Sequence, residues 1–356
     1  MLVLLRIHKV YSCIKVNVLH ITLASEFGAI KDIFVYIMVF VLYDLLHKGV
    51  LDPHDIKILQ ILSNEGRRSY RSIGLEIGLS SKSVKTRIGN MISTGVIEKF
   101  IVIISPSVLG YRKECFIVSK RRDKQNVLNN LRLLGEVILE VESLGGVSAF
   151  KLVIQEDMEH KIQFLADALK PALVETMLVT NSYKTNARLS TTDLSLVKCL
   201  ISNPRLESSE IASKLEISTK TISRRLHTMQ NDQTLKFSIL LNPSSLRGYI
   251  LFGITVNIRE ASYKKILSNI YSGFQEYFLL LPPTLPQDTI TVLFLCKDVF
   301  TSDKILETIE SYKGVIQAEV FLPTKIKLQQ EWLSSEIDKK LLKKEIRLNK
   351  PLITKQ

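Results

Sequence analysis

Residues 79–88 read Leu-Ser-Ser-Lys-Ser-Val-Lys-Thr-Arg-Ile, within a stretch (55–111) whose pattern predicts a helix, a short helix, a tight turn, a third helix and a strand. Ser80 is predicted to cap the third helix, because its hydroxyl can accept an amide proton that the first turn leaves unpaired. The apolar side chains that share one face of this helix are Val84, Ile88 and Met91. The opposite face is basic and hydroxylated, with Ser81, Lys82, Lys85 and Arg87.

A short helix that is apolar behind and basic in front is suited to insertion into the DNA major groove. The plainer interpretation is a small helical segment with a solvated basic face. That interpretation must also account for the order of the elements, for the serine cap, and for the recurrence of the whole pattern further along the chain.

The pattern recurs 138 residues later, where Asp193 matches Asp55 and Arg205 matches Arg67. Residues 217–222, Ile-Ser-Thr-Lys-Thr-Ile, match residues 79–84 in the same register. A one-residue slip then brings Pro243 onto Pro106 and Gly248-Tyr249 onto Gly110-Tyr111. This period is too long for a solenoid repeat and fits the duplication of a complete protein.

The motifs of the first copy are shared with one known family. They are Leu51-Asp52, Asp55, Ile58-Leu59, Leu62, Arg67, Ser69-Tyr70, Ile73-Gly74, Ile77-Gly78-Leu79-Ser80, Val84, Arg87-Ile88 and Gly95-Val96-Ile97. With these motifs, residues 51–111 resemble the winged helix-turn-helix of the leucine-responsive regulator/AsnC (Lrp/AsnC) family of prokaryotic transcription regulators, here in a duplicated, archaeal form. Residues 189–249 resemble it less closely, because Gln233-Thr234-Leu235 replaces Gly-Val-Ile and Glu216 replaces Gly78.

Composition limits the classes of protein and partner. The 356 residues are 46% hydrophobic and 23% charged, which is typical of a globular chain with room for two to four domains. The formal net charge of +13 favours a polyanionic partner, either nucleic acid or an anionic membrane. The cysteines are too scattered for a zinc site and suggest a reducing cytoplasm: Cys13, Cys115, Cys199 and Cys296.

Residues 1–50 form an apolar extension that matches neither repeat. Its densest apolar run, Ile33 to Tyr43, is too short to cross a bilayer, which needs about 20 residues, and no small-residue cleavage site follows it. Three interpretations stay open: an upstream extension with Met38 as the true initiator, an added dimerisation helix, or a weak anchor at a membrane surface. The first is favoured.

Each winged helix is followed by a pattern that predicts β-α-β-β-α-β, the ferredoxin-like unit. In the first unit the predicted helices are Asp123–Leu134 and Met158–Leu169, and in the second a helix capped by Ser302 runs to Tyr312. The expected fold is α+β, with two winged helix-turn-helix domains alternating with two ferredoxin-like (βαββαβ) domains. The predicted boundaries are 1–50, 51–111, 112–188, 189–248, 249–328 and a basic amphipathic helix with its tail at 329–356.

The resemblance implies that the sheet domains bind an effector and form dimers, so that two copies in one chain form a pseudo-dimer. Family members carry a glycine and an acidic residue in the turn between the middle strands. Here residues 144–150 contain Gly145-Gly146 without the acid, and residues 281–288 form a longer, proline-rich loop. This puts amino-acid sensing in doubt, and Gly145-Gly146 is interpreted as a plain hairpin turn.

No catalytic, metal or cofactor motif is recognised. The chain contains no Walker loop, GxSxG or HExxH, and no histidine lies within motif distance of a cysteine or a paired carboxylate. The sequence therefore predicts a protein that is not an enzyme, uses no cofactor and has an unknown effector, if it has one.

The function predicted from the sequence is a cytoplasmic, sequence-specific transcription regulator that binds double-stranded DNA through two recognition helices. Alternatives are a protein-interaction adaptor that no longer reads DNA, and a membrane-associated regulator. Association of copies through the ferredoxin-like sheets is also expected. The candidate DNA-binding residues are Ser80, Ser81, Lys82, Ser83, Lys85, Thr86, Arg87 and Lys99 in the first copy, and Ser218, Thr219, Lys220, Thr221, Ser223, Arg224 and Arg225 in the second. Of these, Arg87 and Arg225 are expected to clamp phosphates.

Overall fold

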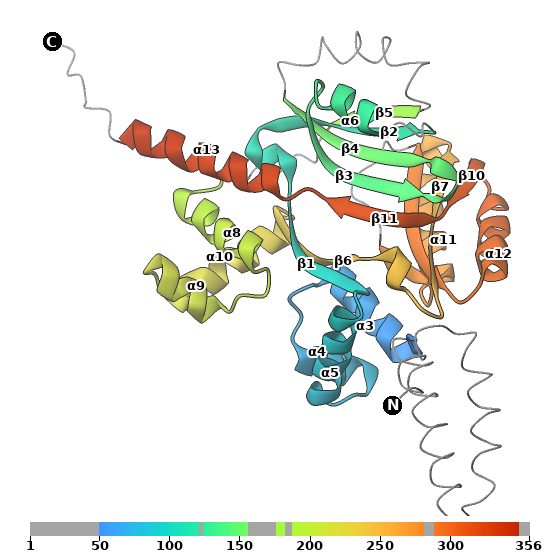
Figure 1. Ribbon diagram of the computed structural model, residues 1–356, viewed down its shortest axis with the longest axis horizontal. Helices are drawn as coiled ribbons and strands as arrows, with labels where there is room; N and C mark the ends of the chain where they lie inside the picture. Colours follow the sequence, from blue (N-terminus) through green and yellow to red (C-terminus); the bar gives the residue numbers. More distant parts are fainter. Residues whose placement is uncertain (1–49, 121–123, 156–175, 182–186, 281–287, 349–356) are drawn as a thin grey trace, which may run out of the picture. The chain divides into compact units, whose positions relative to one another are not determined.

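The computed structural model describes residues 50–120, 124–155, 176–181, 187–280 and 288–348 (Figure 1). Contacts divide the chain into Met1–Val50 and Leu51–Gln356, and the fold is described for the second unit. The predictions for residues 1–49 with Met38, for the helix at 158–169 and for the loop at 281–287 lie outside the described residues.

The first winged helix has the predicted elements: α3 (Pro53–Asn64), α4 (Tyr70–Ile77), α5 (Ser81–Ser93) and β1 (Ile97–Ile104). A reciprocal capping box between Asp52 and Asp55 starts α3. Gly78 ends α4 in the left-handed region at φ 75°, which turns the chain sharply into α5. Ser80 caps α5 as predicted, since its hydroxyl accepts the N–H of Ser83 at 3.1 Å.

The second winged helix repeats this order with α8 (Thr191–Ser202), α9 (Ser208–Leu215), α10 (Thr219–Asn231) and β6 (Leu235–Leu241). Ser190 and Asp193 form the capping box of α8, and Ser218 caps α10. Each recognition helix turns its apolar face into the core. The buried positions are equivalent in the two copies: Val84, Ile88 and Met91 in α5, and Ile222, Leu226 and Met229 in α10.

The two wing strands pair with each other. Strands β1 and β6 form a two-stranded antiparallel sheet in which Ile97 lies opposite Leu241 and Ile104 opposite Leu235. In the sequence repeat, Ile97 is equivalent to Leu235 and Ile104 is equivalent to Leu241. Exchanging the two strands therefore leaves the pairing register unchanged. The pairing therefore joins the two winged helices about a pseudo-two-fold axis.

The first ferredoxin-like domain is described through β2 (Tyr111–Ser119), α6 (Lys124–Leu131), β3 (Glu136–Ser143), β4 (Ser148–Gln155) and β5 (Thr176–Asn181). Its own strands lie in the order β3-β4-β2-β5. The turn between β3 and β4 holds Gly145 and Gly146 at φ near 80°, a conformation that favours glycine. The apolar face of the sheet packs against α6.

The second domain contains β7 (Ile250–Ile258), α11 (Tyr263–Gly273), β8 (Phe278–Leu280), β9 (Thr289–Cys296), α12 (Val299–Glu310) and β10 (Val315–Phe321). The strand order β10-β7-β9-β8 repeats that of the first domain. Single-turn 3₁₀ segments lie at η3 (Pro106–Leu109), η4 (Leu144–Gly146), η6 (Pro243–Ser245) and η7 (Glu260–Ser262). The α+β fold with two duplicated units is therefore as predicted.

One strand and one cap differ from the prediction. Strand β11 (Pro323–Leu328) was not predicted as an element, and it joins the sheet of the first domain beside β3, although the predicted boundaries assign it to the second (Figure 1). Helix α12 is capped by Asp298, which accepts the N–H of Thr301 at 2.8 Å. Ser302 instead lies inside that helix and donates its hydroxyl to the Val299 carbonyl at 2.7 Å.

The C-terminal helix α13 (Glu331–Leu348) follows the predicted amphipathic pattern, with one exception. Leu333 and Ile337 are buried in the core of the second winged helix, and Trp332 packs edge-on against Tyr111 at 5.6 Å. Leu342, predicted on the same apolar side, is 57% exposed. No described helix is long and apolar enough to span a bilayer.

Candidate nucleic-acid interface

The recognition helices present most of the predicted side chains to solvent. In the first copy Ser80, Ser81, Lys82, Lys85, Thr86 and Lys99 are exposed, and in the second Ser218, Thr219, Lys220, Ser223 and Arg224 are exposed. Ser83 and Thr221 are half-buried, and they donate their backbone N–H to the capping serines Ser80 and Ser218 at 3.1 and 3.2 Å. Lys99 lies on β1, whose partner is the strand of the other copy.

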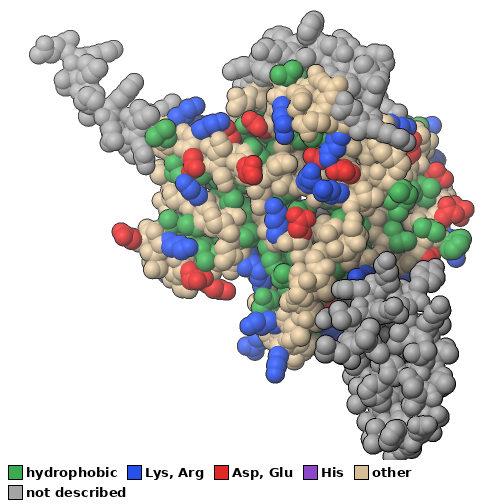
Figure 2. Space-filling view, in the orientation of Figure 1, with side chains coloured by type: hydrophobic (Ala, Val, Ile, Leu, Met, Phe, Trp, Pro, Cys, Tyr) green, Lys and Arg blue, Asp and Glu red, His purple; other side chains and the backbone are tan. Residues whose placement is uncertain are grey.

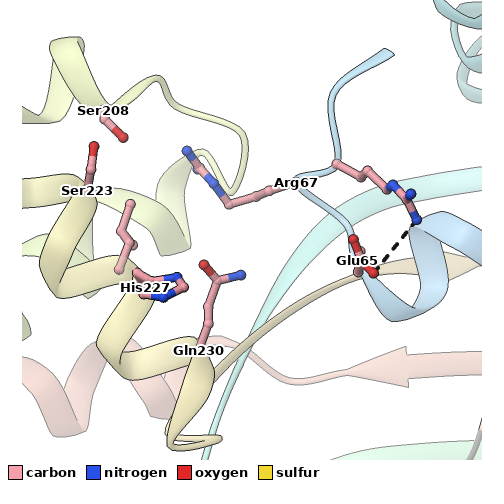
Figure 3. Close-up of a pocket in the computed structure, with 8 residues that line it drawn as sticks. Glu65, Arg67, Ser208, Ser223, His227 and Gln230 are labelled. Carbon is pink, nitrogen blue, oxygen red and sulfur yellow. Dashed lines mark ion pairs between the residues drawn. The ribbon is translucent and has the colours of Figure 1, made fainter. Parts of the chain in front are cut away.

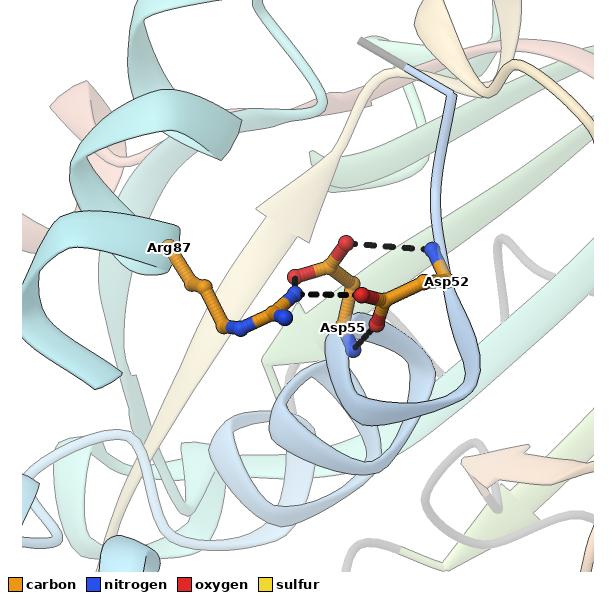
Figure 4. Close-up of polar contacts among 3 residues, drawn as sticks. All are labelled: Asp52, Asp55 and Arg87. Carbon is orange, nitrogen blue, oxygen red and sulfur yellow. Dashed lines mark hydrogen bonds and ion pairs between the residues drawn. The ribbon is translucent and has the colours of Figure 1, made fainter. Parts of the chain in front are cut away.

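Arg87, which is predicted to clamp a phosphate, also forms ion pairs within the first winged helix. Its guanidinium reaches from α5 to the start of α3, where Nη1 donates to Asp52 Oδ2 at 2.7 Å and Asp55 Oδ1 at 2.9 Å (Figure 4). In the second copy Arg225 Nη1 donates to Asp193 Oδ1 at 2.8 Å and Ser190 Oγ at 3.1 Å. Both arginines brace the recognition helix against the capping box of the first helix through Nη1, and their contact with phosphates stays a prediction.

The brace changes the ionisation of its members. Burial raises the pKa of Asp52, but hydrogen bonds from the Asp55 N–H and from Arg87 outweigh this effect, so the pKa lies below its usual value. Asp193 has a lowered pKa for the same balance of burial against hydrogen bonds from Ser190 and Arg225. Burial lowers the pKa of Arg87, but hydrogen bonds to Asp55 and Asp52 raise it overall. Each of these three shifts favours the charged form of its group.

The two reading faces differ in charge. Arg71, Lys82 and Lys85 are exposed on α4 and α5, and Lys and Arg side chains gather at the tip that these helices form (Figure 2). Acidic and basic side chains are mixed over α8, α9 and α10 in the same view. The exposed acids in the second copy are Glu207, Glu210 and Glu216. The first winged helix also exposes three acids, Glu65, Glu76 and Glu98, so the two copies differ in the gathering of basic side chains at the tip of α4 and α5 and not in the number of exposed acids.

Two equivalent arginines hold the winged helices together. Arg67 donates to the carbonyls of Pro204 at 2.6 Å and Leu206 at 2.8 Å. Arg205 makes the equivalent contact in the other direction, because it donates to the carbonyls of Gly66 at 2.8 Å and Arg68 at 3.1 Å. Burial lowers the pKa of both guanidinium groups. This reciprocal contact, called the arginine clasp below, fixes one winged helix against the other.

The clasp also uses aromatic rings. Arg67 lies over Phe237 at 5.1 Å, and Arg205 lies over Phe100 at 5.0 Å and over Tyr70 at 4.9 Å. The sequence aligned Arg67 with Arg205 but assigned them no role. An arginine occurs at the same place in both copies, between the first two helices. This recurrence could have indicated a shared structural role. Exposed Arg71 on α4 was also missed, because it lies outside the third helix and the wing that carry the sequence pattern.

Among the described residues, the candidate contacts lie on the recognition helices, on their caps and on β1, and not on the ferredoxin-like sheets. The Gly145-Gly146 turn lies in the first sheet domain, and the equivalent loop of the second lies outside the described residues. Within the described part of the chain, no group of three or more His, Cys, Asp or Glu residues is arranged to hold a metal ion. The free cysteines Cys115 and Cys296 are buried, and burial raises the pKa of each thiol.

Sequence comparison places each winged helix in a known class. The family model described as winged helix-turn-helix DNA-binding matches residues 51–98 and 189–235. The transcriptional regulator Ptr1 of Methanocaldococcus jannaschii is 30% identical over 146 residues, which are 39% of this chain and 99% of that protein. The regulatory protein AsnC of Haemophilus influenzae is 30% identical over 122 residues, or 33% of this chain and 79% of that protein.

A solved structure aligns with more of the chain. The siroheme decarboxylase NirDL covers 84% of this chain and all of its own, with 17% identity and a TM-score of 0.46. At that level the likeness carries no conclusion about chemistry. The near-complete coverage of Ptr1 by 39% of this chain fits a protein that contains two such units.

Proposed function

Because the chain belongs to the Lrp/AsnC family of transcription regulators, we propose that it is a sequence-specific regulator that reads double-stranded DNA with two recognition helices in one chain. The observation that carries the proposal is the pair of exposed, hydroxylated and basic helix faces, on α5 and α10, each apolar on its opposite side. The curated relatives matched here are transcription regulators.

The residues proposed to contact DNA are the exposed ones. Ser81, Lys82, Lys85 and Thr86 of α5, and Thr219, Lys220, Ser223 and Arg224 of α10, would face bases or phosphates, with Lys99 adding a contact from β1. Phosphate contacts would supply most of the affinity and base contacts the specificity. Arg71 joins this set because it is exposed on α4, the helix before α5. Arg87 and Arg225 are proposed to act indirectly, by holding the two recognition helices in place.

The pseudo-dimer sets the form of the operator. Pairing of β1 with β6 and the arginine clasp place two readers in one chain, which supports half-sites about one helical turn, or a multiple of it, apart. Residues 82–86 read Lys-Ser-Val-Lys-Thr, whereas residues 220–224 read Lys-Thr-Ile-Ser-Arg. Different side chains select different bases, so we expect an asymmetric site. A footprint with perfect dyad symmetry would contradict one chain reading both halves.

The test is fluorescence anisotropy with genomic double-stranded fragments at several salt concentrations. With about 6–10 phosphate contacts, affinity should fall roughly 10³–10⁵-fold between 50 and 200 mM salt. Lys82→Ala/Lys85→Ala should weaken binding more than Lys220→Ala/Arg224→Ala, because basic side chains gather at the tip of α4 and α5, whereas charges of both signs are mixed over α8, α9 and α10 (Figure 2).

The matched control is Lys264→Ala/Lys265→Ala, which removes two exposed charges from α11, outside both winged helices. This variant should bind as the wild type does. If all three pairs weaken binding equally, affinity comes from net charge and not from the reading faces. If the wild type does not bind at low salt, DNA reading is wrong and a protein-binding role for the winged helices takes its place.

Association of copies through the ferredoxin-like sheets is proposed separately. The family resemblance suggests it, and the described sheets end in β5, β8, β10 and β11, whose outer edges have no strand partner among the described residues. Light scattering should give a mass of about two or more chains, and a monomer at micromolar concentration would contradict it.

A further inference from the structure

The two copies differ at one position beside the arginine clasp. Tyr70 begins α4 and its ring contacts Arg205, whereas the equivalent position at the start of α9 is Ser208. Arg205 therefore contacts two rings, Tyr70 and Phe100. Among the described residues Arg67 contacts one ring, Phe237. Loss of the tyrosine ring leaves space on one side of the pseudo-symmetric clasp only.

That space is a pocket of about 470 Å³. Arg67 reaches into it from the first copy, with Ser208 and Ser223 on one side and His227 and Gln230 on the other (Figure 3). The volume lies in the range of small-molecule sites, about 300–1,000 Å³. The lining offers hydroxyl, imidazole and amide groups around a guanidinium that already stacks on an aromatic ring.

The charge around the pocket favours an anion. In the described part of the chain neither Arg67 nor Arg205 forms an ion pair with a carboxylate; both donate to backbone carbonyls. The lining itself holds two guanidinium groups, those of Arg67 and Arg68, against one carboxylate, that of Glu65, and Arg68 also pairs with Glu76 outside the pocket. Burial lowers the pKa of Arg67, and the nearby carboxylate of Glu207 offsets only part of this effect.

We propose that this pocket binds a small planar aromatic anion. Its ring would stack on Arg67 as the Tyr70 ring stacks on Arg205. A guanidinium stacks well on planar rings and pairs with carboxylates, so one ligand can satisfy both features. Ser223 and Gln230 would hydrogen-bond its polar substituents. The pocket adjoins α10, so a bound ligand would shift or hold the second recognition helix. An effect of the ligand on DNA binding rests on the proposed function, whereas the site itself does not.

The probe is 4-hydroxybenzoate, a planar ring with a carboxylate and the phenol of a tyrosine. Binding is measured by calorimetry and by saturation-transfer NMR, on the full chain without DNA. One site per chain with a Kd of about 1 mM or tighter is expected for a ligand of about ten non-hydrogen atoms. Cyclohexanecarboxylate, which has the charge without the planar ring, should bind at least about tenfold more weakly.

The decisive variant is Ser208→Tyr, which restores the ring found in the other copy. It should weaken 4-hydroxybenzoate binding at least about tenfold, because the pocket is then filled. Ser208→Ala, which keeps the space, should bind within about threefold of the wild type. If Ser208→Tyr does not fold, Gln230→Trp, at an exposed position of α10 on the same pocket, is used to fill it instead.

Equal binding by the wild type and a pocket-filling variant would overturn the site, and no saturation by 4-hydroxybenzoate at about 10 mM would overturn the ligand class. DNA anisotropy with and without the probe is a separate measurement. A protein that binds the probe but no DNA would retain the site and lose the proposed function. A protein that binds DNA but not the probe would retain the proposed function and lose the ligand site.

Discussion

Two side chains in the second copy occupy backbone conformations that glycine holds in the first. Glu216 and Gln233 have φ of 55° and 58°, and the equivalent Gly78 and Gly95 have φ of 75° and 77°. Side chains with a Cβ are disfavoured in this region, because Cβ approaches the following carbonyl oxygen. The second copy thus keeps the turns of the first at some cost in stability. Glu216 also places a carboxylate two residues before Ser218, the cap of the recognition helix.

We expect Glu216→Gly to raise the free energy of unfolding by about 1 kcal/mol, since glycine adopts this conformation without strain. Urea denaturation measures the change, and Gly78→Glu in the first copy is the matched reverse variant, which should lose a similar amount. A destabilised Glu216→Gly protein would show that the glutamate side chain makes a compensating contact. The same variant should bind DNA more tightly, because it removes a negative charge beside α10.

The capping-box braces predict a dependence of stability on pH. The pKa values of Asp52 and Asp193 are lowered in the folded state. A lowered carboxylate pKa contributes stability that is fully present above the unfolded value, and this stability is lost as pH falls through the folded value. The stabilisation should therefore disappear progressively below about pH 4.

Urea unfolding of the wild type and of Asp52→Asn/Asp193→Asn between pH 7 and pH 2.5 measures this dependence. The double variant should be less stable at pH 7 and should lose less stability on acidification. If the two proteins have parallel pH profiles, the braces do not contribute to acid sensitivity. Asp298→Asn serves as a comparison outside the winged helices, since the pKa of Asp298 is lowered chiefly by hydrogen bonds within its own cap.

At the scale of elements, the C-terminal helix completes the second winged helix. Leu333 and Ile337 of α13 are 2% and 0% exposed, in the same cluster as Leu196 and Leu200 of α8. Lys198 of α8 also pairs with Asp338 of α13 at 2.6 Å, but both side chains are about half exposed, so this pair adds little. Apolar burial therefore holds α13 in place.

Ile337→Ala should lower the free energy of unfolding by about 2–4 kcal/mol, because it leaves a cavity in a well-packed core. Leu342→Ala, on the same helix but exposed, should change it by less than about 0.5 kcal/mol. Chemical denaturation followed by the fluorescence of Trp332 reports directly on this region. Equal effects of the two substitutions would mean that α13 does not pack as described.

At the scale of the whole molecule, the chain behaves as a pseudo-dimer because non-local contacts join its halves. Strand β11 of the second half extends the first sheet through its pairing with β3, and β1 pairs with β6. The arginine clasp adds four hydrogen bonds between the winged helices. These contacts fix the distance between the two reading faces, so they should set the spacing of DNA half-sites.

We expect Arg67→Met/Arg205→Met to relax that spacing. Insertion of about 5 bp between half-sites rotates one of them by half a helical turn, so it should strongly weaken DNA binding by the wild type. The loss of affinity caused by the same insertion should be roughly tenfold smaller for the double variant. Competition anisotropy with spaced duplexes measures the difference. Arg68→Met is the neighbouring control, because Arg68 pairs with Glu65 and Glu76 of its own copy. An unchanged spacing preference would show that the β1–β6 pairing alone sets the distance.

The sequence by itself determined the elements, their duplication and the α+β fold. Helix caps such as Ser80, the spacing of Val84, Ile88 and Met91, and the alternation of the sheet strands are local features, and they act within a few residues. The exposed candidate side chains of α5 and α10 were identified in the same way. Strand β11 was missed, although residues 324–328, Thr-Lys-Ile-Lys-Leu, alternate as a strand does, because its partner strand β3 lies in the other half of the chain.

Tertiary structure alone decided which partners these elements take. The pairing of β1 with β6, the transfer of β11 to the other sheet, and the use of Arg87 and Arg225 as braces all join residues far apart in the chain. Local periodicity gives the face on which a side chain lies, but not which distant carboxylate, carbonyl or ring will lie opposite it. The clasp and its one-sided pocket could be recognised only once the two copies lay against each other.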